Sequence, residues 1–292
     1  MNQTQPNVIA FGPDGNCTLA LCELEQSVYR YRPSLPANVI FIALYSVAMA
    51  IHIYLGIRWK TQGFMVCMIV GCVDEILGYA GRVMMYYNPF KFVAFMIQIV
   101  CVTTGPIFFC AAIYVTLAQT IDHISPGLAR FSPKFLYWVF IPCDVISLAL
   151  QGAGGAMSTR SSGASNLGVN LALAGLSFQV FTLVVFSALF ADYLVRLWRH
   201  HSRGEAPSLS RRMRAFLGFL GVAVVLILAR CIFRVDELSE GYSGPLVANE
   251  TLFIVFEGVF VIAATFLLCI GHPGLVFNNV NSKESYTGSS SA

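Results

Sequence analysis

Two arginines and a glutamate stand at helical spacing after a long apolar stretch. Residues 215–229 carry no charge, and Arg230, Arg234 and Glu237 follow at positions i, i+4 and i+7. A helix therefore places all three side chains on one face. An arginine at the centre of a membrane helix costs about 2.5–3.5 kcal/mol on insertion scales, so such residues face protein, water or a ligand. We therefore expect other parts of the chain to supply partners for these charges.

Other apolar segments carry polar groups at similar spacing. Counting residues from the segment ends places these groups in the outer half or the middle of the bilayer, which predicts one polar cavity lined by the second, fourth, fifth, sixth and seventh spans. The alternative is a charge network that only holds the helices together. The predicted substrate-binding set is Glu75, Tyr79, Arg82, Asp144, Gln151, Gln179, Arg230, Arg234, Glu237 and Glu257.

The elements that must position these residues are membrane helices. The chain has 292 residues, of which 57% are hydrophobic and 11% charged, whereas a soluble domain has about 25% charged residues. Seven segments reach the length of about 20 residues that a hydrocarbon core requires. The predicted fold is an all-α bundle with spans at 36–57, 63–87, 92–119, 135–156, 167–191, 213–236 and 250–270.

The distribution of basic residues predicts the orientation of the bundle. The loops after spans 1, 3 and 5 and the C-terminal tail hold eleven Lys and Arg residues, whereas the opposite side holds four. Because basic residues accumulate on the cytosolic side, we expect the N-terminus outside and the C-terminus in the cytosol. The predicted division of the chain is a short outer segment (1–35), a transmembrane domain (36–277) and a disordered cytosolic tail (278–292). The net charge of +3 thus follows from topology and does not indicate a nucleic-acid partner.

The predicted outer side carries the signals of an oxidising compartment. Three Asn-x-Ser/Thr triplets, the acceptor pattern for N-glycosylation, start at Asn2, Asn16 and Asn249. Cys17 and Cys22 lie on the same side and are candidates for a disulfide bond. The other seven cysteines lie in the spans, at spacings that do not indicate a zinc site.

Six motifs follow one another in the order of the spans. Those in spans 2 to 4 are Glu75-x-x-Gly78-Tyr79-x-x-Arg82, then Pro106 with Ala111-Ala112-x-Tyr114, then Asp144-x-x-Ser147-x-x-x-Gln151. Those in spans 5 to 7 are Gly175-x-x-x-Gln179, then Arg230-x-x-Phe233-Arg234-x-x-Glu237-x-x-x-Gly241, then Glu250 to Glu257 with His272-Pro273-Gly274. In these motifs the chain resembles the RTA-like, lipid-translocating exporter family of fungal seven-helix membrane proteins over roughly residues 36–277.

The resemblance implies a protein of the plasma membrane that moves sphingoid long-chain bases or related toxic amphiphiles and confers resistance to them. Buried carboxylates could pair with an amine headgroup while the lipid tail lies among apolar walls, and the candidates are Glu75, Asp144, Glu237 and Glu257. Glu257 has no basic residue three, four or seven positions away in its own helix. Its charge must therefore be neutralised by Arg82, Arg230, Arg234 or a ligand.

Two other classes of function remain as alternatives. A receptor or sensor of lipid-like ligands fits the number of helices, although span 3 ends in Gln119-Thr-Ile-Asp122-His rather than an acidic-Arg-aromatic motif. An intramembrane enzyme would need a group of His or Cys side chains at membrane depth, and His52 stands alone there. A retinal protein is excluded because all four lysines lie in loops or the tail. We expect no cofactor, and the sequence does not indicate an oligomeric state.

Overall fold

The computed structural model describes residues 9, 12–13, 15–124, 130, 132–160, 166–203, 211–240, 244 and 246–274. In this part of the chain the secondary structure is helical. The elements are η1 (Leu24–Gln26), α1 (Leu35–Trp59), α2 (Gln62–Tyr87), α3 (Phe92–Ile124), α4 (Pro133–Arg160), α5 (Asn166–Ser202), α6 (Arg211–Ser239), α7 (Glu250–Phe253), the π-helical η3 (Ile254–Val259) and α8 (Phe260–Ile270). The tail predicted at 278–292 lies outside the described residues.

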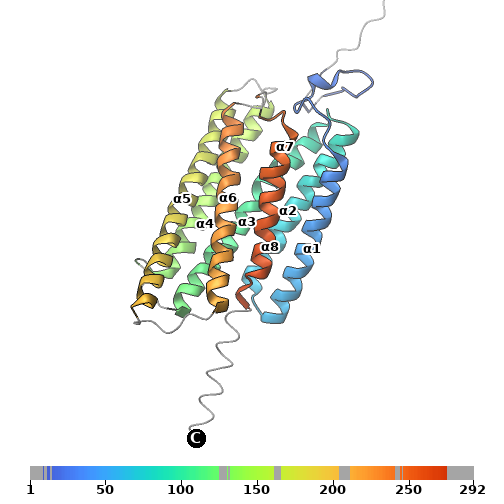
Figure 1. Ribbon diagram of the computed structural model, residues 1–292. Coiled ribbons are helices and arrows are strands. Elements are labelled where there is room, and N and C mark those ends of the chain that lie inside the picture. The colour runs from blue at the N-terminus through green and yellow to red at the C-terminus, as the bar shows by residue number, and fades with distance from the viewer. Residues whose placement is uncertain are drawn as a thin grey trace, which may run out of the picture.

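Seven helical runs in the described residues are long and apolar enough to cross a membrane, which confirms the predicted all-α, seven-span bundle. They are α1 to α6 and the continuous run α7–η3–α8. Figure 1 shows the runs side by side, with α1 starting at the end that carries the N-terminal segment and α8 ending at the opposite end. We call these two ends the N-terminal end and the C-terminal end of the bundle.

Several helices extend past the apolar spans that hydropathy predicts. The span predicted at 167–191 belongs to a helix that continues to Ser202. Asp192 and Arg196 form an ion pair one turn apart in this extension, and basic residues follow in the last turn, where they interact favourably with the helix dipole. Hydropathy marks the part of a helix that lipid can cover, whereas the backbone hydrogen bonds continue into the polar ends.

The bundle is held together by close helix pairs and by an apolar outer surface. Gly78 and Gly175 allow close approach: a Cβ at Gly78 would lie 3.1 Å from the Val102 backbone nitrogen on α3, and one at Gly175 2.8 Å from the Ser147 carbonyl oxygen on α4. Small residues permit such contacts between membrane helices. The side chains that remain exposed along the helices are largely apolar, as lipid requires, and include Ile40, Tyr54, Ile57, Trp138 and Val225.

Pro142 lies inside α4, and two further irregularities interrupt the α-helical hydrogen bonding of α3 and of the seventh run. Pro106 lies inside α3, where it has no backbone N–H to donate to the carbonyl oxygen of Val102. The seventh run widens into a π-helix at Ile254–Val259, and this segment contains Glu257. π-helical turns inside α-helices frequently mark functional sites. Both irregularities lie beside the buried charges described below.

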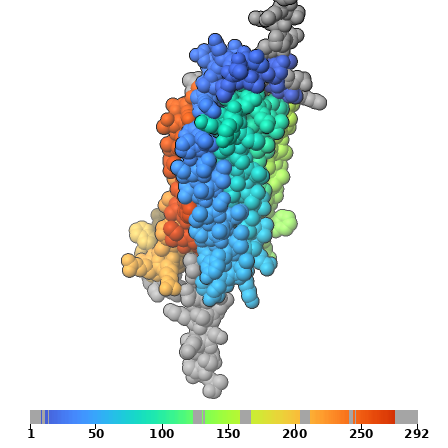
Figure 2. Space-filling model, turned by 90° about the vertical axis from the view of Figure 1, so that its right-hand side faces the viewer, coloured from blue at the N-terminus to red at the C-terminus, as the bar shows by residue number. Residues whose placement is uncertain are grey.

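The N-terminal segment covers one end of the bundle. Figure 2 shows residues of this segment, in dark blue, resting on the end of the helices. Cys17 and Cys22 are joined by a disulfide bond. Further along, the backbone nitrogen of Ser34 donates to Oε1 of Glu250 at 2.6 Å, which ties the start of α1 to the start of α7. The segment is therefore packed against the helices and supplies side chains to their polar groups.

Candidate functional site

The arginines and carboxylates of α6 and η3 form one buried network of ion pairs. Nε of Arg230 donates to Oε2 of Glu257 at 2.8 Å, and both side chains are fully buried. Nε of Arg234 lies 3.5 Å from Oε1 of the same carboxylate, and Nη1 of Arg234 donates to Glu237. The expected pairing of an α6 arginine with an acid across the bundle is thus confirmed. With two positive and two negative charges, the four side chains are neutral together.

Arg230 also bonds to the irregular part of α3. Its Nη2 donates to the carbonyl oxygen of Val102 at 2.9 Å, which is the oxygen that Pro106 leaves without a backbone donor. A buried carbonyl group without a partner is unfavourable. Arg230 therefore donates hydrogen bonds both to the backbone of α3 and to the Glu257 carboxylate of η3.

Arg82 lies in a second group of polar side chains, at the N-terminal end. Its Nε donates to Oδ1 of Asn38 at 3.1 Å, and its Nη2 donates to the Tyr31 hydroxyl at 3.0 Å. The same nitrogen lies 3.4 Å from Oε1 of Glu250, and the guanidinium carbon lies 3.8 Å from the centre of the Phe253 ring, a cation–π contact. The acid that neutralises Arg82 is thus Glu250, which lies outside our predicted set.

Glu75 and Tyr79 lie on α2 and are fully buried. The Tyr79 hydroxyl donates to the backbone carbonyl of Glu257 at 3.2 Å, and its ring stacks on Phe41 and Tyr45 of α1. The hydrogen bond from Tyr79 thus holds the π-helical segment against α2. The carboxyl group of Glu75 forms no hydrogen bond with the described residues.

The polar residues of α4 and α5 form a third group. Nε2 of Gln151 donates to Oε1 of Gln179 at 2.9 Å. The buried carboxyl group of Asp144 lies near the hydroxyls of Tyr114 and Thr182. No Lys or Arg of the described residues forms an ion pair with Asp144. Neither carboxyl oxygen of Asp144 has a hydrogen-bond partner among the described residues, so this group joins a pair of bonded amides to a buried carboxyl group without an ion pair.

The described residues form a pocket whose walls differ from those of the single cavity predicted between spans 2, 4, 5, 6 and 7, and the predicted binding set stays a prediction. A pocket of about 590 Å³ lies at the N-terminal end between α3, α4, α5, α6 and residues 25–30. Of the predicted set, Gln151, Arg234 and Glu237 line it, whereas the other seven residues do not. Helical spacing gives the depth of a residue and its face on its own helix, but not how neighbouring helices are rotated about their axes.

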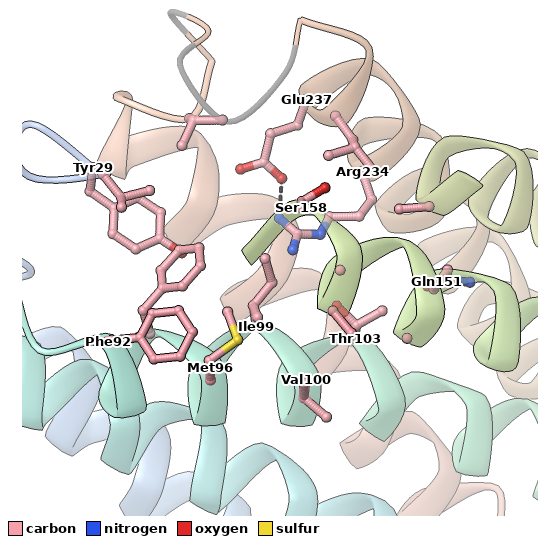
Figure 3. A pocket seen from close by; sticks show the side chains of 18 of the residues that line it. Tyr29, Phe92, Met96, Ile99, Val100, Thr103, Gln151, Ser158, Arg234 and Glu237 are labelled. Carbon is pink, nitrogen blue, oxygen red and sulfur yellow. Dashed lines mark hydrogen bonds and ion pairs between the residues drawn. The ribbon is translucent and has the colours of Figure 1, made fainter. Parts of the chain in front are cut away.

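The walls of the pocket are mostly apolar, and polar side chains of the N-terminal segment, α3, α4 and α6 line the rest. Figure 3 shows Phe92, Met96 and Ile99 of α3 along one side, and the paired side chains of Arg234 and Glu237 on the other. A site with mostly apolar walls and a few convergent polar groups is typical of small-molecule binding. The arrangement can accommodate an amphiphile, with the headgroup at the ion pair and the chain along α3.

Tyr29 closes the pocket from the N-terminal segment. It lines the pocket, and its hydroxyl donates to Oε1 of Gln98 on α3. Burial raises the pKa of the Tyr29 hydroxyl, and the nearby Arg82 opposes this shift; burial likewise raises the pKa of Tyr31 against the opposing effect of Arg82. Both hydroxyls therefore remain protonated at neutral pH and can donate hydrogen bonds.

Two of the glycosylation triplets fall on described residues. Asn16 and Asn249 are exposed, and Oδ1 of Asn249 accepts hydrogen bonds from the backbone nitrogens of Thr251 and Leu252, which caps α7. Asn2 lies outside the described residues. Among those residues no three His, Cys, Asp or Glu side chains are placed to share a metal ion.

Sequence reasoning missed the contribution of α3 and of the N-terminal segment. Tyr29 lines the pocket and bonds to Gln98, and Tyr31 bonds to Arg82, yet the two tyrosines precede the spans and Gln98 is one polar residue in an apolar run. The alternation Tyr29-x-Tyr31 just before a membrane helix is the signal that could have found the two tyrosines, because tyrosines favour the membrane interface.

The chain matches known proteins over most of its length. A family profile described as "RTA1 like protein" matches residues 68–280. The chain is 28% identical over 279 residues to the sphingoid long-chain base transporter RSB1 of Saccharomyces cerevisiae strain Lalvin EC1118, with 84% of this chain and 73% of the relative covered. It is 27% identical over 225 residues to protein RTM1 of S. cerevisiae, covering 75% and 70%.

A further relative is protoporphyrin uptake protein 1 of S. cerevisiae strain ATCC 204508 / S288c, 28% identical over 202 residues that cover 69% of this chain and 66% of the relative. No solved structure matches the chain. The family profile covers more than half of the residues, including all spans from α3 onwards. The chain belongs to the RTA1-like protein family.

Proposed function

We propose that this protein translocates amphiphilic lipids that carry a positively charged headgroup, with sphingoid long-chain bases as the leading class. The observation that carries the proposal is the pocket of about 590 Å³, whose apolar walls end at the buried pair of Arg234 and Glu237. An ammonium group is neutralised well by a carboxylate, and apolar surface buried with it adds about 25 cal/mol per Å².

Within the pocket, Glu237 is the residue that would receive the amine, because the other acidic lining residue, Glu25, is exposed on the N-terminal segment. Of the four carboxylates expected for this role, Glu75, Asp144 and Glu257 do not line the pocket. Glu257 is already paired with Arg230 and Arg234. Glu237 pairs with Arg234 alone among the described residues, and it can exchange that partner for an ammonium because Arg234 keeps its contact with Glu257.

The side chains beside the ion pair suit a polar headgroup. Gln151 lines the pocket, and its Oε1 has no hydrogen-bond partner among the described residues. Thr103 of α3 offers a hydroxyl on the facing wall, as Figure 3 shows. These groups could bond to the hydroxyls of a sphingoid base.

The relatives support the class of substrate. One of them is named a sphingoid long-chain base transporter and aligns with most of this chain. We propose the same class here, and we place the protein in the plasma membrane with the pocket open towards the outer leaflet. Removal of toxic amphiphiles from the cell would then confer resistance to them.

Transport by reconstituted vesicles tests this function. Protein in liposomes should raise the rate at which labelled sphinganine crosses the bilayer. Glu237→Gln should lower this rate roughly tenfold or more, since a hydrogen bond to a charged group contributes about 1.5–3 kcal/mol. Asp236→Asn is the matched control, because the neighbouring Asp236 is exposed and lies outside the pocket.

Selectivity for charge distinguishes an amine site from a general lipid path. Hexadecanol, which has no charge, should be transported equally by wild-type protein and Glu237→Gln. Equal loss of sphinganine and hexadecanol transport in the variant would reject the amine site, and wild-type liposomes no faster than protein-free liposomes would reject translocation.

A further inference from the structure

Glu75 is a buried carboxyl group with no structural partner. Its side chain is fully buried in α2, and neither of its oxygens has a hydrogen-bond partner among the described residues. It packs against Gly105 of α3, where a Cβ would lie 2.7 Å from Oε1. A glycine at this position therefore makes room for the carboxyl group.

Titratable and charged groups surround Glu75 from every side. Those contributed by other elements are Tyr45 of α1, Cys101 of α3, Arg230 of α6 and Glu257 of η3. Those of its own helix are Cys72, Asp74 and Tyr79. Only Arg230 among them carries a positive charge.

Arg230 has an unused donor. Nε and Nη2 bond to Glu257 and to the Val102 carbonyl, whereas Nη1 has no hydrogen-bond partner among the described residues. Glu75 is close enough to interact electrostatically with this guanidinium. A buried donor and a buried acceptor are thus neighbours that do not bond to each other in this arrangement.

A chain of ion pairs leads from the pocket to Arg230, the charged neighbour of Glu75. Glu237 in the pocket wall pairs with Arg234, Arg234 also contacts Glu257, and Glu257 pairs with Arg230. The two arginines and two carboxylates already balance. An ionised Glu75 would add an uncompensated negative charge in a fully buried position, which is strongly unfavourable. The arrangement therefore requires a neutral, protonated Glu75.

We propose that Glu75 releases its proton when a cationic amphiphile binds in the pocket. This inference rests on the proposed function. The ammonium of the ligand pairs with Glu237, Arg234 moves its charge onto Glu257, and Arg230 turns Nη1 to the ionised Glu75. The O–H bond of Glu75 breaks and the proton passes to the solution, so one positive charge enters and one leaves. Such an exchange couples amphiphile transport to a proton gradient.

Calorimetry measures the exchange directly. Hexadecylamine is titrated into the protein in lipid nanodiscs near neutral pH, where its amine is charged as that of lysine is. Titrations in two buffers of different protonation enthalpy give the number of protons released per amine bound. We expect about one proton from wild-type protein and from Asp74→Asn, a control next to Glu75 in sequence. We expect none from Glu75→Gln, which should still bind the amine.

The affinity gives a second readout. Wild-type protein should bind the amine more tightly as pH rises, approaching tenfold for each unit of pH, while Glu75→Gln should show no such dependence. Glutamine resembles a neutral glutamic acid in shape, so the variant should fold. An unfolded Glu75→Gln protein would show that Glu75 is ionised and paired, and would overturn the inference.

The remaining outcomes separate this inference from the proposed function. Amine bound by wild-type protein without proton release overturns the exchange and leaves the amine site intact. Proton release that persists in Glu75→Gln assigns the proton to another group and also overturns it. Absence of amine binding by wild-type protein rejects both the site and the exchange.

Discussion

Arg230 and Val102 are joined by a hydrogen bond that replaces one missing from helix α3. Nη2 of Arg230 donates at 2.9 Å to the carbonyl oxygen of Val102, and Pro106, four residues further on, has no N–H for that oxygen. The arginine that neutralises Glu257 thus also completes the backbone hydrogen bonding of α3. The irregular part of α3 and the charge network are therefore one structural unit.

Replacement of Arg230 should show this double role. Arg230→Gln removes the 2.8 Å partner of Glu257 and the donor to Val102, and should lower the free energy of unfolding by about 3–5 kcal/mol. Pro106→Ala, which restores a backbone N–H, should recover about 1 kcal/mol in the Arg230→Gln background and less in wild-type protein. Denaturant titrations in mixed micelles measure all four proteins.

The matched control is an exposed ion pair. Arg196→Gln disrupts the pair with Asp192, whose side chains are both 38% exposed, and should change the free energy of unfolding by less than about 1 kcal/mol. Equal effects of Pro106→Ala in both backgrounds would show that Arg230 and the α3 backbone are independent.

Protonation of His272 should destabilise the protein in mild acid. Its Nδ1 accepts a hydrogen bond from the backbone nitrogen of Gly274 at 3.1 Å, so the ring is neutral. Burial, together with the nearby His52, lowers the pKa of His272 to about 4, against about 6.5 in an unfolded chain. Between these values the unfolded state binds more protons, and stability therefore falls as pH falls from about 6.5 to 4.

The size of this effect is set by the difference between the two pKa values. Its upper limit is about 3 kcal/mol at pH 4. Unfolding measured across this range for wild-type protein and His272→Gln isolates the contribution, because glutamine does not titrate. Parallel pH profiles of the two proteins would contradict the assignment.

The sequence allowed prediction of the helices because lipid imposes a simple rule on them. A span needs about 20 apolar residues whatever its neighbours are, so α1 to α6 and the run from Glu250 to Ile270 could be located from composition alone. The burial of charged residues could be predicted as well, because a charged side chain in a span cannot face lipid. The four examples are all fully buried: Glu75, Arg82, Arg230 and Glu257.

The partners of these residues could not be predicted in the same way. Glu250 and Glu257 are seven residues apart and would share one face of a regular helix, yet they pair with Arg82 and Arg230 respectively. Glu257 lies inside the π-helical segment Ile254–Val259, whereas Glu250 precedes it, and no residue pattern marked that segment. Tyr29 could not be placed either, because the packing of the N-terminal segment depends on tertiary contacts.

The orientation of the bundle in the membrane can be tested by labelling. The eleven-to-four bias of basic residues predicts that the loop 196–214 is cytosolic. A cysteine introduced by Ser202→Cys, at an exposed position, should react with an impermeant maleimide only after the cells are permeabilised. Glu23→Cys, which is exposed on the N-terminal segment, should react in intact cells. The reverse pattern would invert the topology.

Filling the pocket should block transport without loss of the fold. Gly155 of α4 lines the pocket, and no described atom lies within 4 Å of a Cβ built on it. Gly155→Leu therefore adds a side chain to free space, and leucine also favours the helix by up to about 1 kcal/mol over glycine. We expect an unchanged or higher melting temperature together with a strong loss of sphinganine transport in liposomes.

Gly218→Leu is the control for this variant. Gly218 is an exposed residue of α6, likewise with no described atom within 4 Å of a built Cβ, but it lies outside the pocket. The same substitution there gains the same helix propensity, so transport should match that of wild-type protein. If Gly155→Leu transports sphinganine as fast as Gly218→Leu does, the amphiphile does not pass through this pocket. If both variants lose transport equally, leucine disturbs the helices rather than the site, and the pocket loses its assigned role.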